Sequence, residues 1–163
     1  MTVIRTMTLA DAMSVCARMR ERDRWCLGAL MGDIEDEAFA VNRWQTVGPA
    51  WAMDDEAGTP RAIAGLSFSN DWTAVWWLIA TDAMGAHSWG KALAHARTVT
   101  RQIAHPRHEH YRHRVEAHVM ADWPESQRWI ARLGFRLEAT RKAAGRGGED
   151  VQTWAITGPA KGE

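Results

Sequence analysis

The chain lacks the features that mark secreted and membrane-spanning proteins. Its only cysteines are Cys16 and Cys26, and such a pair is no disulfide framework, so a reducing compartment is expected. Residues Met1 to Met7 contain no basic region followed by an apolar run, and we therefore expect no signal peptide. The longest apolar run, Ala74 to Ala80, is far too short for a membrane span. These absences favour a cytoplasmic location.

Net charge is also missing, because 20 Lys and Arg residues balance 20 Asp and Glu residues. No overall charge therefore draws the chain to nucleic acid or to an anionic membrane. The stretch from Arg97 to Arg114 is locally basic, but it carries no nucleic-acid motif, so we expect a solvated face. Four histidines gather in the same stretch, at His105, His108, His110 and His113. Apart from Glu109 no carboxylate or thiol completes an ordered ligand set, so no metal is expected.

Tryptophan is abundant, with ten residues, whereas there is a single tyrosine. Tryptophan is favoured both in cores and at interfaces. Two interpretations stay open: a tryptophan-rich core, or a partner surface that uses some of the tryptophans, with Trp25, Trp44, Trp51 and Trp72 as the candidates.

The periodicity of apolar residues predicts a mixed α/β domain with the order β-α-α-β-β-β-α-β-α-β-β. The signals include a helix start at Thr8 with Asp11 three residues later, and a charged, solvated continuation of that helix over Arg20 to Arg24. Gly28 and Gly32 should break the region, and Asp33 should cap a second helix. Pro124 suits the first turn of a late helix, and Gly134 is placed to end it. Expected strands cover residues 3–7, 50–53, 61–69, 73–81, 112–120, 135–140 and 151–157, and the clearest helix covers 86–104. We expect one domain over residues 1–158 and a flexible tail over 159–163.

Two segments carry a resemblance to a known family. Trp76 to Leu93 (WWLIATDAMGAHSWGKAL) resembles the central strand, phosphate loop and following helix of the GNAT (Gcn5-related N-acetyltransferase) superfamily, and Trp123 to Phe135 resembles its late helix ending in Leu-Gly-Phe. The resemblance implies a GNAT-like fold, a mostly antiparallel mixed sheet of about seven strands with about four helices. It also implies transfer of acetyl from acetyl-CoA to an unknown amine acceptor.

A narrower resemblance is to GNAT-like bacteriophage proteins of the internal virion protein A type. It rests on Ile4-Arg5, on Trp76-Trp77 running into Thr81-Asp82, on Gly90-Lys91 and on the strand Thr153 to Thr157. It implies a phage-encoded protein in the host cytoplasm or the virion. The alternative function is then a catalytically inactive structural protein whose partners are other virion proteins, since fold does not fix function. A third possibility is a modulator that binds a host protein.

The GNAT resemblance assigns acetyl-CoA to the end of the central strand and to the loop after it. The implied cofactor-binding residues are Leu78, Ile79, Ala80, Gly85, Ser88, Trp89, Gly90 and Lys91. The family's loop reads Q/R-x-x-G-x-G/A, and these positions fall on Gly85, Ser88 and Gly90, so only Gly90 matches. A helix N-terminus binds phosphate through its free N–H groups, but a plain strand-to-helix turn without a ligand stays an equal alternative.

The catalytic residues are less clearly marked. The family's general-acid tyrosine falls on Ile130, and its asparagine falls on Trp123, where the neighbouring Asp122 is either a substitute or a helix cap. Glu116 and His118 share one face of a strand and are the candidates for a general base, since histidine titrates near neutral pH. The alternative is a solvated or salt-bridged strand face with Arg114.

Overall fold

Residues 2–160 are described in a computed structural model, and they form five helices and seven strands. The helices are α1 (Leu9–Cys16), α2 (Glu21–Met31), α3 (Asp36–Gln45), α4 (Ala86–Ile103) and α5 (Pro124–Arg132). The strands are β1 (Val3–Thr6), β2 (Ala50–Asp54), β3 (Pro60–Phe68), β4 (Thr73–Ala80), β5 (Arg114–Met120), β6 (Arg136–Arg141) and β7 (Val151–Thr157). The predicted flexible tail falls, for residues 161–163, outside the described residues.

The described strands join in the order β1-β2-β3-β4-β5-β7-β6. The pairs β1–β2, β2–β3, β5–β7 and β6–β7 are antiparallel, whereas β4 and β5 are parallel, with Thr73 opposite Arg114 and Val75 opposite Glu116. The mostly antiparallel mixed sheet that the sequence predicted is thus confirmed, and β4 is a central strand as expected. Contacts divide the chain into two compact units, residues 2–67 with 77–91 and residues 68–76 with 92–160. Each unit is described on its own.

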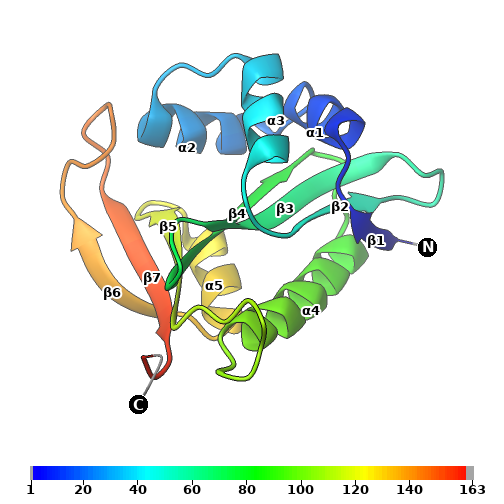
Figure 1. Ribbon diagram of the computed structural model, residues 1–163. Coiled ribbons are helices and arrows are strands. Elements are labelled where there is room, and N and C mark those ends of the chain that lie inside the picture. The colour runs from blue at the N-terminus through cyan, green and yellow to red at the C-terminus, as the bar shows by residue number, and fades with distance from the viewer. Residues whose placement is uncertain (1, 161–163) are drawn as a thin grey trace. The chain divides into compact units, whose positions relative to one another are not determined.

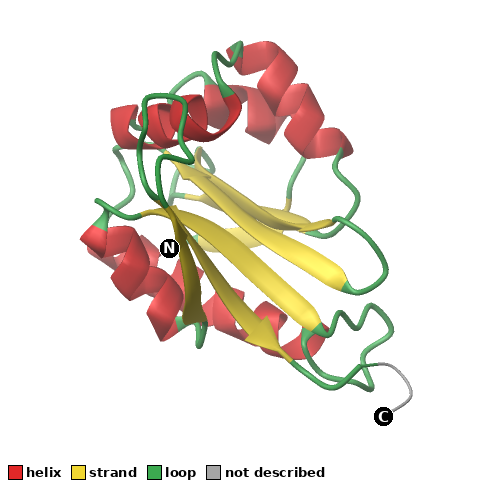
Figure 2. Cartoon of the chain, turned by 90° about the vertical axis from the view of Figure 1, so that its left-hand side faces the viewer, coloured by secondary structure: helices red, strands yellow, loops and turns green. Residues whose placement is uncertain are grey.

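The first unit packs helices on a β-meander. In Figure 1, α1, α2 and α3 lie together above β2 and β3, and Figure 2 shows the same three helices at the top, over the yellow strands. Its core is a cluster of buried apolar side chains from α1, α3, β2, β3, β4 and the segments on either side of α1: Met7, Ala12, Val15, Cys16, Met19, Phe39, Ala40, Ala52, Ile63 and Ile79. Burial of such side chains is the main stabilising term of the unit.

The second unit is built around β5. The face that Glu116 and His118 were expected to share is opposite the buried one, because Val115, Ala117 and Val119 are buried while His118 is exposed. β7 pairs with β5 along its whole length, and β6 follows as the outer strand with every residue exposed. Figure 1 shows β6 and β7 side by side. An irregularity in the β6–β7 register between Leu137 and Ala139, together with the charged side chains of β6, makes this edge a poor template for further pairing.

Several local predictions are confirmed. Thr8 and Asp11 form the expected capping box at the start of α1. The long helix predicted over 86–104 is α4. Pro124 lies in the first turn of α5, and Gly134, with φ of 101°, follows its end as expected for a glycine that terminates a helix.

The prediction for the segment after α1 was wrong. The charged stretch from Arg20 to Arg24 was expected to be a solvated continuation of the first helix. Instead Arg20 is extended, with φ of −56° and ψ of 145°, and a separate helix, α2, begins at Glu21. Residues 2–160 therefore contain five helices rather than about four. Gly28 lies inside α2 and does not break it, because an isolated glycine costs a helix only about 1 kcal/mol.

The predicted cap of the next helix was also wrong. Glu35, not Asp33, caps α3, and its carboxylate accepts hydrogen bonds from the N–H groups of Glu37 (3.1 Å) and Ala38 (2.7 Å). Of the four tryptophans proposed for a surface, Trp44 and Trp72 are exposed, whereas Trp25 and Trp51 are half-buried. Both cysteines are free.

Candidate functional site

The predicted phosphate loop covers the end of the turn between β4 and α4 together with the first residues of α4. The helix begins at Ala86, so Gly85 lies in the turn, whereas the residues from Ser88 to Lys91 lie in the helix. All eight residues assigned to the cofactor, from Leu78 to Lys91, belong to the first unit. Gly85 and Gly90 are exposed, and a Cβ added at either would meet no atom within 4 Å. There is therefore open space in front of both glycines. The turn leads into a helix of 18 residues, whose first N–H groups attract anions.

The side chains of Ser88 and Lys91, near the start of α4, both contact Thr2. The hydroxyls of Ser88 and Thr2 lie 3.0 Å apart, and Lys91 Nζ donates to the carbonyl of Thr2 at 3.1 Å. The two side chains lie on one face of α4 because they are three residues apart. An ammonium group has three donors, so the contact with Thr2 leaves two for another acceptor.

The side chain of Arg20, from a different segment, lies over a ring of Trp89. The guanidinium carbon of Arg20 lies 5.0 Å from the centre of a Trp89 ring, in cation–π geometry. The same guanidinium donates to the carboxylate of Asp23 from Nη2 (2.7 Å) and Nε (3.1 Å). Gly85 stands at the position of the family's basic residue, but Arg20 places a positive charge beside Trp89. Its charge is balanced by Asp23.

The backbone of Ala80 is bonded on both sides of its Cα. Its N–H donates to Asp23 Oδ2 at 2.8 Å, and its carbonyl accepts from the N–H of Arg20 at 2.9 Å. The N–H of Thr81 donates instead to Arg61 of β3 at 2.9 Å. Because successive residues of a strand direct their backbone groups to opposite edges, Ala80 is bonded at the edge that β3 does not occupy. Arg20 and Asp23 thus clamp the end of β4, and we call this contact the Ala80 clamp.

Sequence reasoning missed the Ala80 clamp. Asp23 is only 5% exposed, and its burial raises the pKa of its carboxyl, although the bonds to Arg20 and Ala80 act in the opposite direction. A cofactor arm that lay along β4 would compete with Asp23 for the N–H of Ala80. The only sequence signal was the short spacing of Arg20 and Asp23, which resembles an ordinary surface pair on a helix.

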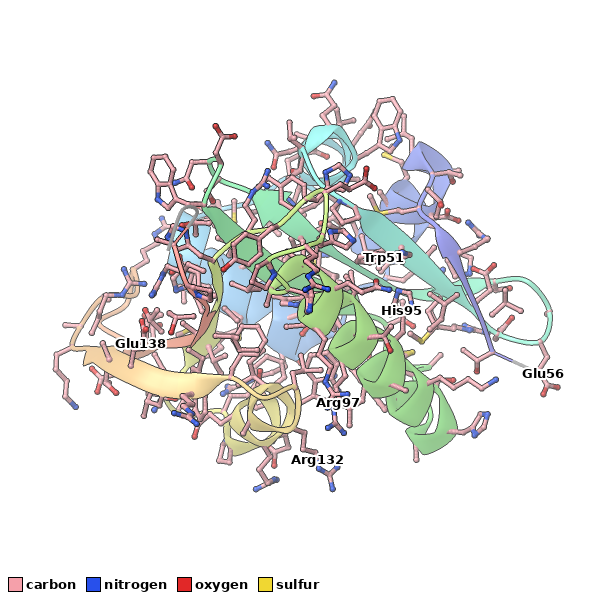
Figure 3. The ribbon with its side chains drawn as sticks, turned by 60° about the horizontal axis from the view of Figure 1, so that its bottom comes forward. Trp51, Glu56, His95, Arg97, Arg132 and Glu138 are labelled. Carbon is pink, nitrogen blue, oxygen red and sulfur yellow. The ribbon has the colours of Figure 1, made fainter. Side chains whose placement is uncertain are left out.

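The candidate bases lie in the second unit, on β5. Arg114 Nε donates to Glu116 at 2.7 Å and its Nη2 donates to Glu138 at 2.6 Å; Glu138 lies on β6, as Figure 3 shows. His118 Nε2 lies 3.6 Å from Glu116 Oε1. The salt-bridged face that the sequence left open as the alternative is therefore present. The pKa of His118 is lowered, chiefly by partial burial, so its imidazole is neutral at pH 7.

The remaining candidates contribute no proton donor. Trp123, not Asp122, is the N-cap of α5, and it makes no side-chain capping bond; Asp122 is exposed. Ile130 is buried, at 4% exposure, where the resemblance would place a tyrosine. The only tyrosine, Tyr111, is buried and donates its hydroxyl hydrogen to the carbonyl of Pro159 at 2.5 Å.

The histidine-rich loop and the helices were searched for other sites. Within residues 2–160, no three histidine, cysteine or acidic side chains gather in a way that could hold a metal ion. None of the helices described is long and apolar enough to cross a membrane.

Comparison of the fold finds acetyltransferases. A putative acetyltransferase, YncA, from Salmonella typhimurium, solved with its cofactor acetyl-CoA, matches with a TM-score of 0.74 at 16% identity over 100% of this chain and 98% of that one. A GNAT superfamily phosphinothricin acetyltransferase from Sinorhizobium meliloti, in complex with acetyl-CoA, also gives 0.74, at 18% identity over 99% and 94%. A mutant of the spermidine N-acetyltransferase SpeG from Vibrio cholerae gives 0.68, at 13% identity over 96% and 93%.

Comparison of the sequence, in contrast to that of the fold, finds no match. No protein-family model matches the chain, and no curated protein matches it. At these identities the structural likeness concerns the arrangement of the backbone. The neighbours match along nearly their whole length, and the strand order and the β4–turn–α4 segment described above lie within the matched part. The chain has the fold of the GNAT superfamily acetyltransferases.

Proposed function

We propose that the chain is an acyl-CoA-dependent N-acetyltransferase-like protein that transfers acetyl from acetyl-CoA to an amine. The observation that carries this is the start of the long helix α4, which begins at Ala86 and has open space in front of Gly85 and Gly90. Two neighbours of the same fold are solved with acetyl-CoA. Acetyl-CoA supplies an activated thioester carbonyl to the reaction.

The residues of the turn fit the phosphate end of this molecule. The first N–H groups of α4 and the free donors of Lys91 would hold the pyrophosphate, because both favour an anion. Ser88 replaces a glycine of the family pattern, but its hydroxyl can donate to a phosphate oxygen. Along β4, by contrast, the Ala80 clamp opposes binding, since Asp23 must yield the N–H of Ala80.

His118 is the residue that we propose to accept the proton of the amine. Its neutral imidazole can take up a proton, and Glu116, at 3.6 Å, would stabilise the charge that results. Arg114 holds Glu116 in place through the 2.7 Å bond to its carboxylate. No described group takes the tyrosine's role at Ile130, so the leaving thiolate would be protonated by solvent.

Binding of acetyl-CoA tests the proposal directly. Isothermal titration of the wild type should give heat, and the ligand should raise the melting temperature, because a ligand of the folded state stabilises it. Ser88→Glu places a negative charge at the start of α4, which favours the helix but repels phosphate. It should abolish binding without loss of stability. Ala94→Glu, at an exposed position further along α4, is the matched control and should bind normally.

A second function is favoured by two specific observations. The Ala80 clamp and the buried Ile130 suit a catalytically inactive protein that keeps the fold as a scaffold. Membership of a phage virion rests on the short sequence resemblance alone, and the named neighbours are acetyltransferases. Absence of acetyl-CoA binding together with recovery of the protein in purified virus particles would establish the scaffold role in place of the enzyme.

A further inference from the structure

Arg43 is a partly buried cation without a counter-charge. It lies in the last turn of α3, and its guanidinium carbon lies 5.4 Å from the ring centre of Phe39 and 5.5 Å from that of Trp77. Its only hydrogen bond to the part of the chain that the structure describes is from Nη2 to the side-chain oxygen of Asn42, at 2.7 Å. No carboxylate within residues 2–160 forms an ion pair with it.

Two donors in this cluster are shielded from solvent and have no acceptor. They are Nε of Arg43 and Nε1 of Trp77. The two rings attract the charge of Arg43, but a ring face accepts no ordinary hydrogen bond. An unpaired buried donor is costly, and more so when it is charged. Burial accordingly lowers the pKa of Arg43.

The thiol of Cys16, which acts electrostatically on Arg43, does not neutralise it. The thiol of Cys16 is fully buried, and this burial raises its pKa to about 11. It is therefore protonated and uncharged at neutral pH. A further unpartnered group, the hydroxyl of Ser67, lies on β3 two residues beyond Gly65 and so on the same face of the strand.

The position of Trp77 is set by the absence of a side chain at Gly65. A Cβ at Gly65 would lie 2.6 Å from Cζ2 and 2.8 Å from Cε2 of Trp77. The indole therefore rests directly against β3, beneath Arg43. Only glycine permits this arrangement. It fixes the direction of the indole N–H of Trp77, which no atom of the described residues accepts.

We propose that Arg43 and Trp77 form a binding site for a carboxylate, and that this carboxylate belongs to the acceptor amine. A carboxylate offers two acceptor oxygens, which suits the donor fork of a guanidinium together with a neighbouring N–H. The acceptor is then an amino acid or a similar molecule. The identity of the ligand as acceptor rests on the proposed transferase function, whereas the carboxylate site itself does not.

Binding of amino acids in the absence of acetyl-CoA tests the carboxylate site. The twenty standard amino acids, each at millimolar concentration, are compared with their carboxamides by thermal shift and then by titration calorimetry on the full chain. At least one amino acid should raise the melting temperature, and its carboxamide should not. Equal effects of acid and amide, or no effect from any amino acid, would overturn the proposal. A shift by inorganic phosphate alone would also overturn it, since the site would then be a general anion site.

Variants separate this site from the cofactor turn. Arg43→Gln should weaken binding of the amino acid about tenfold to a hundredfold, and Arg97→Gln, which changes an exposed arginine of α4, should leave it unchanged. Trp77→Phe keeps an aromatic side chain and removes the indole N–H, so it should also weaken binding. It tests the site even if Arg43→Gln fails to fold. Unaltered affinity in both Arg43→Gln and Trp77→Phe contradicts the site. Acetyl-CoA titrated into the same proteins reports separately on the transferase proposal.

Discussion

The indole N–H of Trp76 donates to the hydroxyl of Thr100 at 2.7 Å, and both residues are buried in the second unit. This bond joins β4 to α4. A tryptophan inside a core needs such a partner because its N–H is a donor only. The pair therefore satisfies a polar group that burial would otherwise leave unpaired.

Thr100→Val should destabilise the protein by about 1–3 kcal/mol, because the shape is kept while the indole N–H of Trp76 loses its acceptor. Thr100→Ser keeps the hydroxyl and is the matched control. Urea unfolding followed by circular dichroism measures both. Equal loss in the two variants would mean that the methyl group, and not the hydrogen bond, matters at this position.

Acid should weaken the link between β1 and α1. Arg5 donates to both oxygens of Asp11, at 2.6 and 2.8 Å, and this lowers the pKa of Asp11 from 3.8 to about 2. Because the pKa of Asp11 is lower in the folded protein than in the unfolded chain, its ionised carboxylate stabilises the fold. This contribution is fully present above pH 3.8 and is lost as the pH falls toward 2. It amounts to about 2 kcal/mol.

The variant Asp11→Asn removes this dependence. Its free energy of unfolding should be lower than that of the wild type at pH 6, and the difference should shrink between pH 4 and about pH 2. Denaturant titrations at several pH values measure it. A constant difference over this range would show that Asp11 does not titrate in the folded protein as proposed.

Two glycine substitutions should have opposite signs. Gly65→Ala forces a Cβ to 2.6 Å from Trp77 and 2.9 Å from the carbonyl of Pro49, so overpacking should cost roughly 1–3 kcal/mol or more. Gly28→Ala places a Cβ in open space within α2 and should stabilise by about 0.5–1 kcal/mol. A Gly65→Ala variant that melts at or above the wild-type temperature would contradict the packing seen at Gly65, and a lower melting temperature for Gly28→Ala would contradict the open space at that position.

Local sequence patterns predicted most of the secondary structure. The capping box of Thr8 and Asp11 and the glycine after α5 are signals within one turn of chain, and the structure has both. The start of α2 was missed because its signal is weak: Arg20 is extended but supplies no side-chain cap. Gly28 was expected to break the helix, but it lies inside α2. The charged residues from Arg20 to Arg24 were expected to be solvated, but Asp23 is buried.

The site was harder to predict because its contacts join distant residues. Asp23 and Ala80 are 57 positions apart, and no local pattern pairs a carboxylate with one particular backbone N–H. The same holds for Arg43 and Trp77, whose relation depends on the missing side chain of Gly65. The positions of Gly85, Ser88 and Lys91, in contrast, followed from a continuous segment. Their role toward acetyl-CoA and the roles of Glu116, His118 and Asp122 stay predictions.

The Ala80 clamp makes a prediction that separates the two candidate functions. If acetyl-CoA uses the N–H of Ala80, Asp23 competes with it, and Asp23→Ala should raise the affinity for acetyl-CoA by about tenfold, the equivalent of one hydrogen bond of about 1.4 kcal/mol. The same variant should be less stable without ligand, since Arg20 and Ala80 both lose their partner. Calorimetric titration and thermal unfolding measure the two effects.

Asp36→Ala is the control for this variant. It removes the ion pair that Asp36 makes with Arg24, at 2.6 Å, within the same unit and leaves Ala80 bonded, so it should change stability without changing affinity. Unchanged or weaker binding in Asp23→Ala would mean that acetyl-CoA does not compete for this edge of β4. In that case the clamp is a permanent part of the fold, and because an occupied strand edge cannot hold a thioester arm, the scaffold function would be favoured over the enzyme.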